Sequence, residues 1–309
     1  MFGYVVRRFL QAIPVFFGAT LLIYFMVFAL PGDPILALFG DRTPNPAVLQ
    51  QLQDQYHLND PFFVQYFYYI AGIFQGDLGN TFSGQSVNDV LARTLPVTGR
   101  LAVMAIGIEF VLAIIIGSIS ALRKGGIFDN TALIIALVFV AIPIFVLCFL
   151  SQYFLAIQWE LFRPTVGAQN DWGDLWLPAL VLGFSLYAIS MRLMRGSVID
   201  TLNQDWVRTA YSKGLPRSRV VPVHVLRNSL LPVITNSATN FGVLLVGATV
   251  TEGIFNIPGV GNTLFDAIRL HEGPTVVSFV TVFVILYLIV NLVVDLLYGL
   301  LDPRIRYVS

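Results

Sequence analysis

Long apolar stretches alternate with polar connections along the whole chain of 309 residues. A helix that spans a lipid bilayer needs about 20 mostly apolar residues. Six stretches reach that length: residues 9–30, 97–122, 131–157, 175–194, 230–250 and 275–299. The fourth is the least apolar, because Ser185, Ser190 and Arg192 interrupt it. The pattern predicts an all-α integral membrane protein, a single domain with six transmembrane helices.

The first apolar stretch follows Arg7 and Arg8, an arrangement that is also found in cleaved secretory signal peptides. Its apolar run is longer than the roughly 7–15 residues of a signal peptide, and five further stretches follow it. We therefore interpret it as the first helix of the bundle.

The composition supports a membrane protein and argues against a metalloenzyme. Hydrophobic residues make up 56% of the chain and charged residues only 12%, whereas about a quarter of an ordinary soluble domain is charged. The formal net charge is zero, so no overall field attracts nucleic acid. Cys148 is the single cysteine, and His57, His224 and His271 are scattered without the spacing of a helical metal site.

The distribution of Lys and Arg predicts the orientation, because these residues gather on the cytoplasmic side of membrane proteins. With a cytoplasmic N-terminus, the outer side would carry only Arg42, Arg93, Arg100, Arg163 and Arg269 of the 18 basic residues. Most acidic residues would then lie outside. Both termini are therefore predicted to be cytoplasmic, with residues 31–96 extracytoplasmic and residues 195–228 cytoplasmic.

These two long connections carry helix signals. In the outer segment, Asn45–Pro46, Asp60–Pro61 and Ser86 with Asp89 each mark a helix start, which predicts short amphipathic helices. The inner segment is basic and reads as two short helices joined at residues 214–216. Its charge alone is equally consistent with topology anchors or with binding of anionic lipid.

The inner segment also carries a recognisable motif. It reads Asp-Trp-Val-Arg-Thr-Ala-Tyr-Ser-Lys-Gly-Leu over residues 205–215 and Leu-Arg-Asn-Ser-Leu-Leu-Pro over residues 226–232. This closely resembles the coupling segment of binding-protein-dependent ABC importer permeases, in the form of their dipeptide and oligopeptide branch. The general motif is Glu-Ala-Ala, three residues, then Gly; here Arg208, Thr209 and Ala210 precede Gly214. Pro222 is less usual in that branch, and we expect it to kink the second short helix.

Four further segments resemble the family in the family's order, so that the resemblance covers nearly the whole chain. They are residues 30–34 (Leu-Pro-Gly-Asp-Pro), 56–61 with 76–79, 251–261, and 301–307. The resemblance implies the fold of a type I importer permease. It also implies a second homologous permease subunit, two ATPase subunits and an extracytoplasmic solute-binding protein as partners, in the bacterial cytoplasmic membrane with its lipid.

The resemblance further implies that residues 207–215 dock on a separate ATPase. The coupling residues are Val207, Arg208, Thr209, Ala210, Lys213, Gly214 and Leu215. The chain has no Gly-Lys pair and hence no phosphate-binding loop, so ATP and magnesium are expected on the partner subunits, and no cofactor on this chain. Gly214 suits a left-handed turn, although an ordinary helix C-cap predicts the same residue.

Two other groups of residues are candidates for roles in transport. By resemblance, the segment from Glu252 to Gly261 dips back toward the pore mouth; its candidate outer-gate residues are Glu252, Phe255, Pro258, Gly259 and Gly261.

Glu109 and Asp295 lie within predicted spans, where acids normally face a cavity or a partner. We favour structural contacts over a place on the translocation path. Asn236, Asn240 and Asn291 are expected to hydrogen-bond between helices.

Two other classes of membrane protein fit the sequence less well. A gradient-driven secondary transporter would show inverted repeats and paired broken helices, and a membrane enzyme would need a cluster of catalytic groups; neither is visible in the sequence. With these two classes disfavoured, we follow the resemblance, which implies a pore-forming permease subunit and not an enzyme. Relatives of the resembled family carry dipeptides, oligopeptides, glutathione, nickel or haem, and the sequence favours peptides only weakly.

Overall fold

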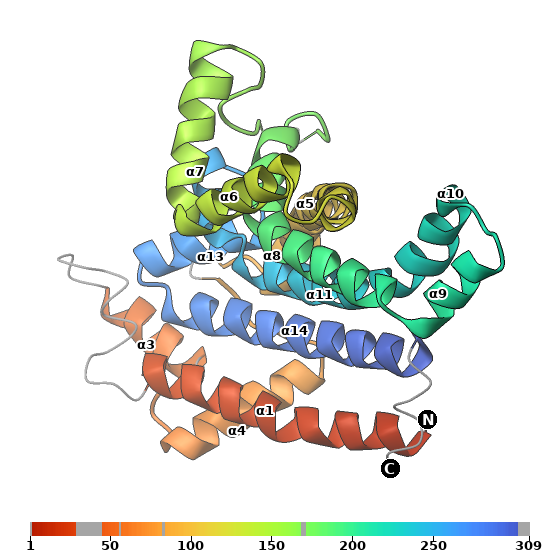
Figure 1. Cartoon of the computed structure of the whole chain (residues 1–309). Helices are drawn as coiled ribbons and strands as arrows, with labels where there is room; N and C mark the ends of the chain where they lie inside the picture. The colour runs from red at the N-terminus through yellow and green to blue at the C-terminus, as the bar shows by residue number, and fades with distance from the viewer. Residues whose placement is uncertain (1, 29–44, 56, 82–83, 168–170, 302–309) are drawn as a thin grey trace. The chain divides into compact units, whose positions relative to one another are not determined.

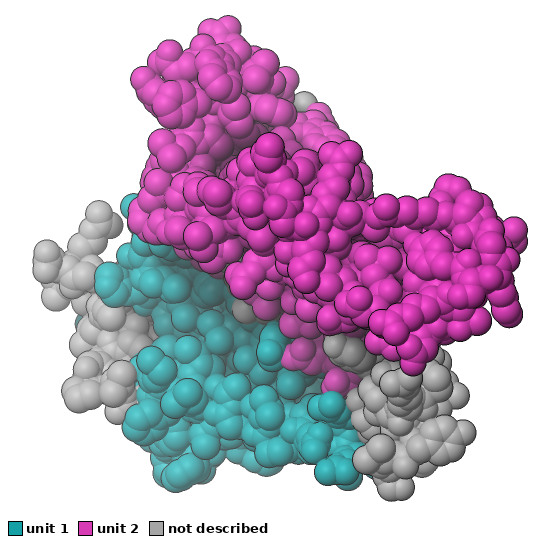
Figure 2. All heavy atoms as spheres, viewed as in Figure 1, with its two compact units in different colours: residues 1–98, 258–289 teal, residues 99–257, 290–309 magenta. Residues whose placement is uncertain are grey.

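The computed structural model describes residues 2–28, 45–55, 57–81, 84–167 and 171–301, and its regular elements there are helices (Figure 1). The chain forms two compact units (Figure 2). Unit 1 comprises residues 1–98 and 258–289, and unit 2 comprises residues 99–257 and 290–309. The motifs at residues 30–34 and 302–307 lie outside the described residues.

Four helices are long and apolar enough to cross a membrane within the described ranges. They are α1 (Phe2–Phe28), α5 (Val87–Leu122), α8 (Trp176–Leu202) and α14 (Gly273–Leu301). Two bent helix pairs raise the number of candidate spans to as many as six. The helix α8 continues beyond the predicted end at residue 194.

The bent pairs correspond to the third and fifth predicted spans. The third begins as α6 (Ile127–Ala141) and then bends by 102°. After the bend it continues as α7 (Ile144–Ser151), which runs directly into the π-helix η1 (Gln152–Gln158). The residue before Pro143 is extended, with ψ 124°, because the proline ring disfavours helical geometry there. The stretch predicted as one helix is therefore broken. In the fifth, α11 (Arg227–Gly247) is followed by α12 (Thr249–Phe255).

In unit 1, two short helices begin where the proline signals predicted them. They are α3 (Pro46–Gln55) and α4 (Phe62–Phe74). The third signal, at Ser86, does not start a separate helix: α5 begins at Val87 and runs through Pro96 into the second span. The unit also contains α13 (Val260–Arg269). Tyr69 of α4 donates a hydrogen bond of 2.5 Å to Thr281 of α14, which joins α4 to that span.

In unit 2, α8 packs against α6 and α11, and it approaches α5 closely at two glycines. Small residues allow the backbones to approach. A Cβ atom on Gly117 of α5 would lie 2.7 Å from the Met191 carbonyl oxygen, and one on Gly183 of α8 would lie 2.8 Å from Ile108 Cγ2. Glycine at such contacts is typical of membrane helix packing, where close approach replaces the hydrophobic driving force.

Candidate functional site

The predicted coupling segment contains the helix α9 (Asp205–Ser212). Gln204 precedes the helix in an extended conformation, and Asp205 places a carboxylate in its first turn, where the positive end of the helix dipole stabilises it. The hydroxyls of Thr209 and Ser212 donate back to the carbonyls of Asp205 and Arg208. The sequence therefore favours a short helix with a defined start.

The end of α9 is a glycine cap. Gly214 has φ +78°, in the left-handed region that glycine occupies without strain. Its N–H donates to the Tyr211 carbonyl (2.9 Å), and the Leu215 N–H donates to the Ala210 carbonyl (3.3 Å). This pair of bonds defines the Schellman motif. The left-handed turn expected at Gly214 is present, and it is also the helix C-cap.

One face of α9 is buried in the core of unit 2. Val207 is 1% exposed and Ala210 is 7% exposed, and Leu215 packs beside them. The buried residues of this cluster come from α5, α8, α9 and the segment that follows; they are Ala113, Ala121, Met194, Val198, Val207, Ala210, Val220, Val225 and Val233. The short helix is thus fixed to the long helices by apolar contact.

The other face of α9 is exposed and carries two large rings. Trp206 is 43% exposed and Tyr211 is 40% exposed. Arg208, Thr209 and Lys213 are also exposed. Arg208 lies 3.7 Å from Asp205 across the helix surface, and such an exposed ion pair contributes little to stability. This face can contact another molecule without disturbing the buried one.

The chain returns to the bundle through α10 (Arg217–Val220) and the π-helix η2 (Val221–Leu226), which leads directly into α11. Pro222 lies in the first turn of η2, so the expected irregularity is a π-helical turn. Ser229 Oγ lies within hydrogen-bond distance of Ser197 O (3.2 Å) and of Thr201 Oγ1 (3.0 Å). These bonds join the returning helix to α8.

A buried ion pair joins Asp129 of α6 to Arg195 of α8, and sequence reasoning missed it. Both Asp129 oxygens accept from Arg195, at 2.6 and 2.7 Å. Asp129 also accepts from Ser120 Oγ and from the N–H of Gly125 at 2.8 Å. Asp129 is 1% exposed, so the guanidinium fork compensates a carboxylate that has left water. The partners are 66 residues apart, and no local pattern joins them.

The acid expected within the second span, Glu109, holds three helices together. It is fully buried and accepts hydrogen bonds from Ser190 of α8, from Ser237 of α11 (2.8 Å) and from Asn240 of α11 (3.5 Å). Asn236 donates to Ser190 Oγ at 2.7 Å. The interhelical bonds expected of Asn236 and Asn240 are confirmed. Asp295 lies in α14 and is half-buried.

The candidate outer-gate residues are divided between the two units. Glu252 and Phe255 lie in α12 of unit 2 and are buried, while Pro258, Gly259 and Gly261 belong to unit 1. The expected irregular segment is mostly helical, because only residues 256–259 lie between α12 and α13. Within unit 2, the Val166 N–H donates to the Phe255 carbonyl at 2.9 Å. Within unit 1, the Val260 N–H donates to Thr98 Oγ1 at 3.0 Å.

Comparison with known proteins identifies the class of this membrane protein. The family model described as "Binding-protein-dependent transport system inner membrane component" matches residues 113–307, and the corresponding N-terminal model matches residues 1–102. The chain belongs to this family of ABC importer permeases, in its dipeptide and oligopeptide branch.

Three relatives show how far the similarity extends. The chain is 35% identical to the dipeptide transport system permease protein DppB of Escherichia coli K12, over 99% of both chains. It is 34% identical to DppB of Bacillus subtilis 168, over 99% of this chain and 98% of the relative. It is also 34% identical to the oligopeptide transport system permease protein OppB of E. coli K12, over 99% of this chain and all of the relative.

Proposed function

We propose that this chain is the pore-forming permease subunit of an ATP-driven importer of di- and oligopeptides in the bacterial cytoplasmic membrane. It works beside a second homologous permease and takes peptide from an extracytoplasmic binding protein. ATP and magnesium bind to two separate ATPase subunits. The named relatives support the peptide cargo, since they are dipeptide and oligopeptide permeases along nearly their whole length.

The observation that carries the proposal is the division of α9 into a buried face and an exposed face. Val207 and Ala210 pack α9 against α5 and α8 in one apolar cluster, whereas Trp206 and Tyr211 remain exposed. A displacement imposed on the exposed face would move the long helices as a body, because close-packed interiors transmit strain. We propose that an ATPase subunit docks on this face. Closure of the two ATPase subunits on each other would then drive alternating access of the permease.

The test is co-purification of the ATPase subunits through a tag on this chain, expressed with its neighbouring genes. Trp206→Ala removes an exposed ring from the proposed interface, where aromatic residues commonly dominate binding energy. We expect recovery of the ATPase to fall at least about tenfold, equivalent to about 1.4 kcal/mol, while the partner permease is retained. Gly214→Arg is a less specific variant, since φ +78° already disfavours any side chain.

Two single variants form a matched comparison, because each reverses the charge of one exposed basic residue. Arg208→Glu alters α9, whereas Lys124→Glu alters the turn after α5, outside the proposed dock. We expect only the first to reduce ATPase recovery and peptide-stimulated ATP hydrolysis. Equal recovery for Trp206→Ala, Arg208→Glu and the wild type would exclude α9 as the dock. Uptake driven by an ion gradient without any ATPase would instead favour the secondary transporter.

A further inference from the structure

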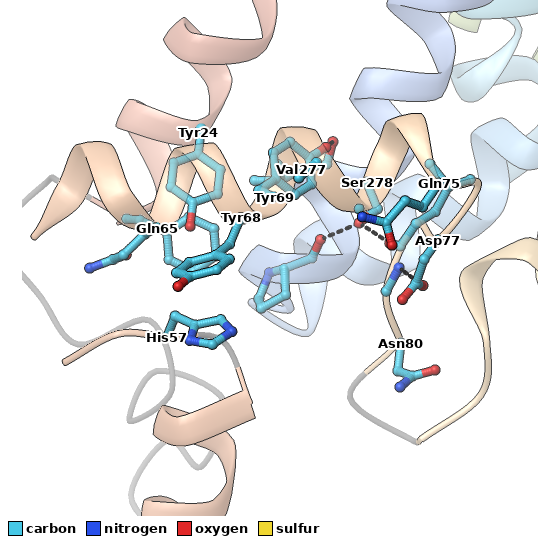
Figure 3. A pocket seen from close by; sticks show the side chains of 16 residues that line it. Tyr24, His57, Gln65, Tyr68, Tyr69, Gln75, Asp77, Asn80, Val277 and Ser278 are labelled. Atoms are coloured by element: carbon cyan, nitrogen blue, oxygen red, sulfur yellow. Dashed lines mark hydrogen bonds between the residues drawn. The ribbon is translucent and has the colours of Figure 1, made fainter. Parts of the chain in front are cut away.

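Unit 1 contains a cavity that the proposed coupling mechanism does not use. Its volume is about 430 Å³, within the range of small-molecule sites. It lies between α1, α4 and the start of α14, and His57 and the segment after α4 also line it (Figure 3). On the orientation proposed from Lys and Arg, it opens on the extracytoplasmic side.

The cavity is elongated along α4. Figure 3 shows Gln65 at one end and Asp77 at the other, with Tyr68 and Tyr69 between them. Gln65 of α4 and Gln75, the residue that caps the C-terminus of α4, both line it. They are ten residues apart, which corresponds to about 15 Å along a helix. An extended chain advances about 3.3 Å per residue. The length therefore matches about four residues of extended peptide.

Aromatic side chains form the walls. The hydroxyl-bearing rings of Tyr24, Tyr68 and Tyr69 line the cavity, and the His57 ring stacks on Tyr68 with centroids 4.4 Å apart. Burial raises the pKa of the Tyr69 phenol well above its ordinary range, so this group stays neutral, with its proton donated to Thr281. Such walls accept methylene groups and small side chains, and their ring faces also attract cations.

Gln65 brings an unused acceptor to one end. Its amide nitrogen donates to Asp60 O (2.7 Å) and Leu58 O (3.3 Å), which fixes the direction of the amide. Its Oε1 is buried and makes no hydrogen bond within the described part of the chain, and the residue is only 9% exposed. A buried acceptor without a donor is costly. A peptide N–H would satisfy it after a turn of the Gln65 side chain that brings Oε1 to the cavity surface.

The charge of the cavity favours a cation and disfavours an anion. Asp77 supplies a carboxylate, of which Oδ1 accepts from the Gly79 N–H at 2.8 Å. The described lining residues include neither Lys nor Arg. The remaining polar side chains include the amides of Gln75 and Asn80, which match the donors and acceptors of a peptide backbone.

We infer that this cavity is an extracytoplasmic binding site for a short extended peptide, with the amino-terminal ammonium beside Asp77 and a backbone N–H bound by Gln65. The site lies on the permease itself, apart from any binding protein. The choice of a peptide among possible amines rests on the proposed function.

The probe is tetra-alanine amide, whose only charge is its ammonium group, compared with N-acetyl-tetra-alanine amide. The full chain, purified with its partner permease in phosphatidylcholine nanodiscs, is titrated by calorimetry. We expect the free-amine peptide to bind more tightly. Asp77→Asn is expected to weaken its binding about threefold to fivefold, as for an exposed ion pair, and to leave the acetylated peptide unchanged. Asp54→Asn, in the neighbouring helix α3, removes the same charge outside the cavity and is the control.

A second pair of variants tests the walls. Tyr68→Ala removes a lining ring, whereas Phe67→Ala removes an adjacent ring of the same helix that does not line the cavity; both side chains are at least half exposed. Tyr68→Ala should weaken both peptides several-fold, and Phe67→Ala neither. Absence of binding to the wild type, or equal effects within each pair, would overturn the inference.

Two further arms separate the possible failures. If phosphatidylethanolamine nanodiscs abolish peptide binding, the site takes a lipid amine and the peptide assignment is wrong. Peptide uptake is also measured in proteoliposomes with the ATPases and the binding protein. Uptake without direct binding to the permease pair would refute the cavity site and leave the proposed function intact, whereas direct binding without uptake would refute the transport function alone.

Discussion

The helices α8 and α1 differ in a way that hydropathy does not predict. In the most apolar 18-residue window of each span, 61% of the residues are buried in α8 but only 11% in α1. Yet α1 is the more hydrophobic of the two, with a mean hydropathy of 2.0 against 1.6. The least apolar span in the sequence is therefore the most buried of the four long helices.

The physical reason is that lipid is itself an apolar solvent. A helix surrounded by lipid must be apolar on all sides, whereas a helix surrounded by protein can carry polar groups that find partners. Ser190 and Arg195 of α8 bind Glu109 and Asp129, and Gly183 admits a neighbouring helix. High hydropathy thus reports an apolar environment outside the subunit's own core, and polar interruptions such as Ser190 mark the interior of unit 2.

The largest effect on this comparison of α8 with α1 is expected from removing Arg195, the cation of the buried ion pair with Asp129. Arg195→Met leaves Asp129, 1% exposed, without its guanidinium, and breaking a buried pair costs about 3 kcal/mol or more. We expect a large loss of thermal stability, measured as the temperature at which the full chain in detergent aggregates.

Arg163→Met is the matched control for that change. Arg163 pairs with Asp174 at 3.0 Å, but its side chain is 74% exposed, so we expect a loss of no more than about 1 kcal/mol. Equal losses for the two variants would show that α8 is not held by its ion pair.

Close helix packing gives a smaller effect that sharpens the same comparison. Alanine at Gly117 would place its Cβ 2.7 Å from the Met191 carbonyl and 2.8 Å from Met194 Cβ. The strain should cost about 1–3 kcal/mol. In the same helix, Gly107 has no atom within 4 Å of an added Cβ, and Gly107→Ala should raise helix stability by up to about 1 kcal/mol. Opposite shifts in the aggregation temperature are the expected result.

Local signals were enough to predict some parts of the fold. The starts of α3 and α4 follow from Asn45–Pro46 and Asp60–Pro61, and the turn at Gly214 follows from a breaker between two helical patterns. The apolar run through Pro143 concealed the bend of 102°, because apolar residues on both sides of a proline look continuous when only hydropathy is considered.

Contacts between distant residues were predicted less completely. Glu109, Asn236 and Asn240 were expected to bond within the membrane, but their partners were not identified. Ser190 is 81 residues from Glu109, and Ser237 is 128 residues from it. The cavity along α4 was likewise not predictable from the sequence, because its lining residues come from α1, α4 and α14. Such sites depend on tertiary packing that one sequence does not reveal.

The smallest expected effect concerns the exposed face of α1. Leu22 is 61% exposed, and its neighbours in the assembled membrane are either lipid or another subunit. If they are lipid, Leu22→Ala should change stability by no more than about 0.5 kcal/mol, as for an ordinary surface substitution, and co-purification of the partner permease should be unchanged. A clear loss of the partner with an unchanged aggregation temperature would place a protein interface on α1. The low burial of α1 would then mean that another subunit covers this helix in the assembled transporter. Hydropathy alone could not distinguish lipid from such a subunit, because both environments are apolar.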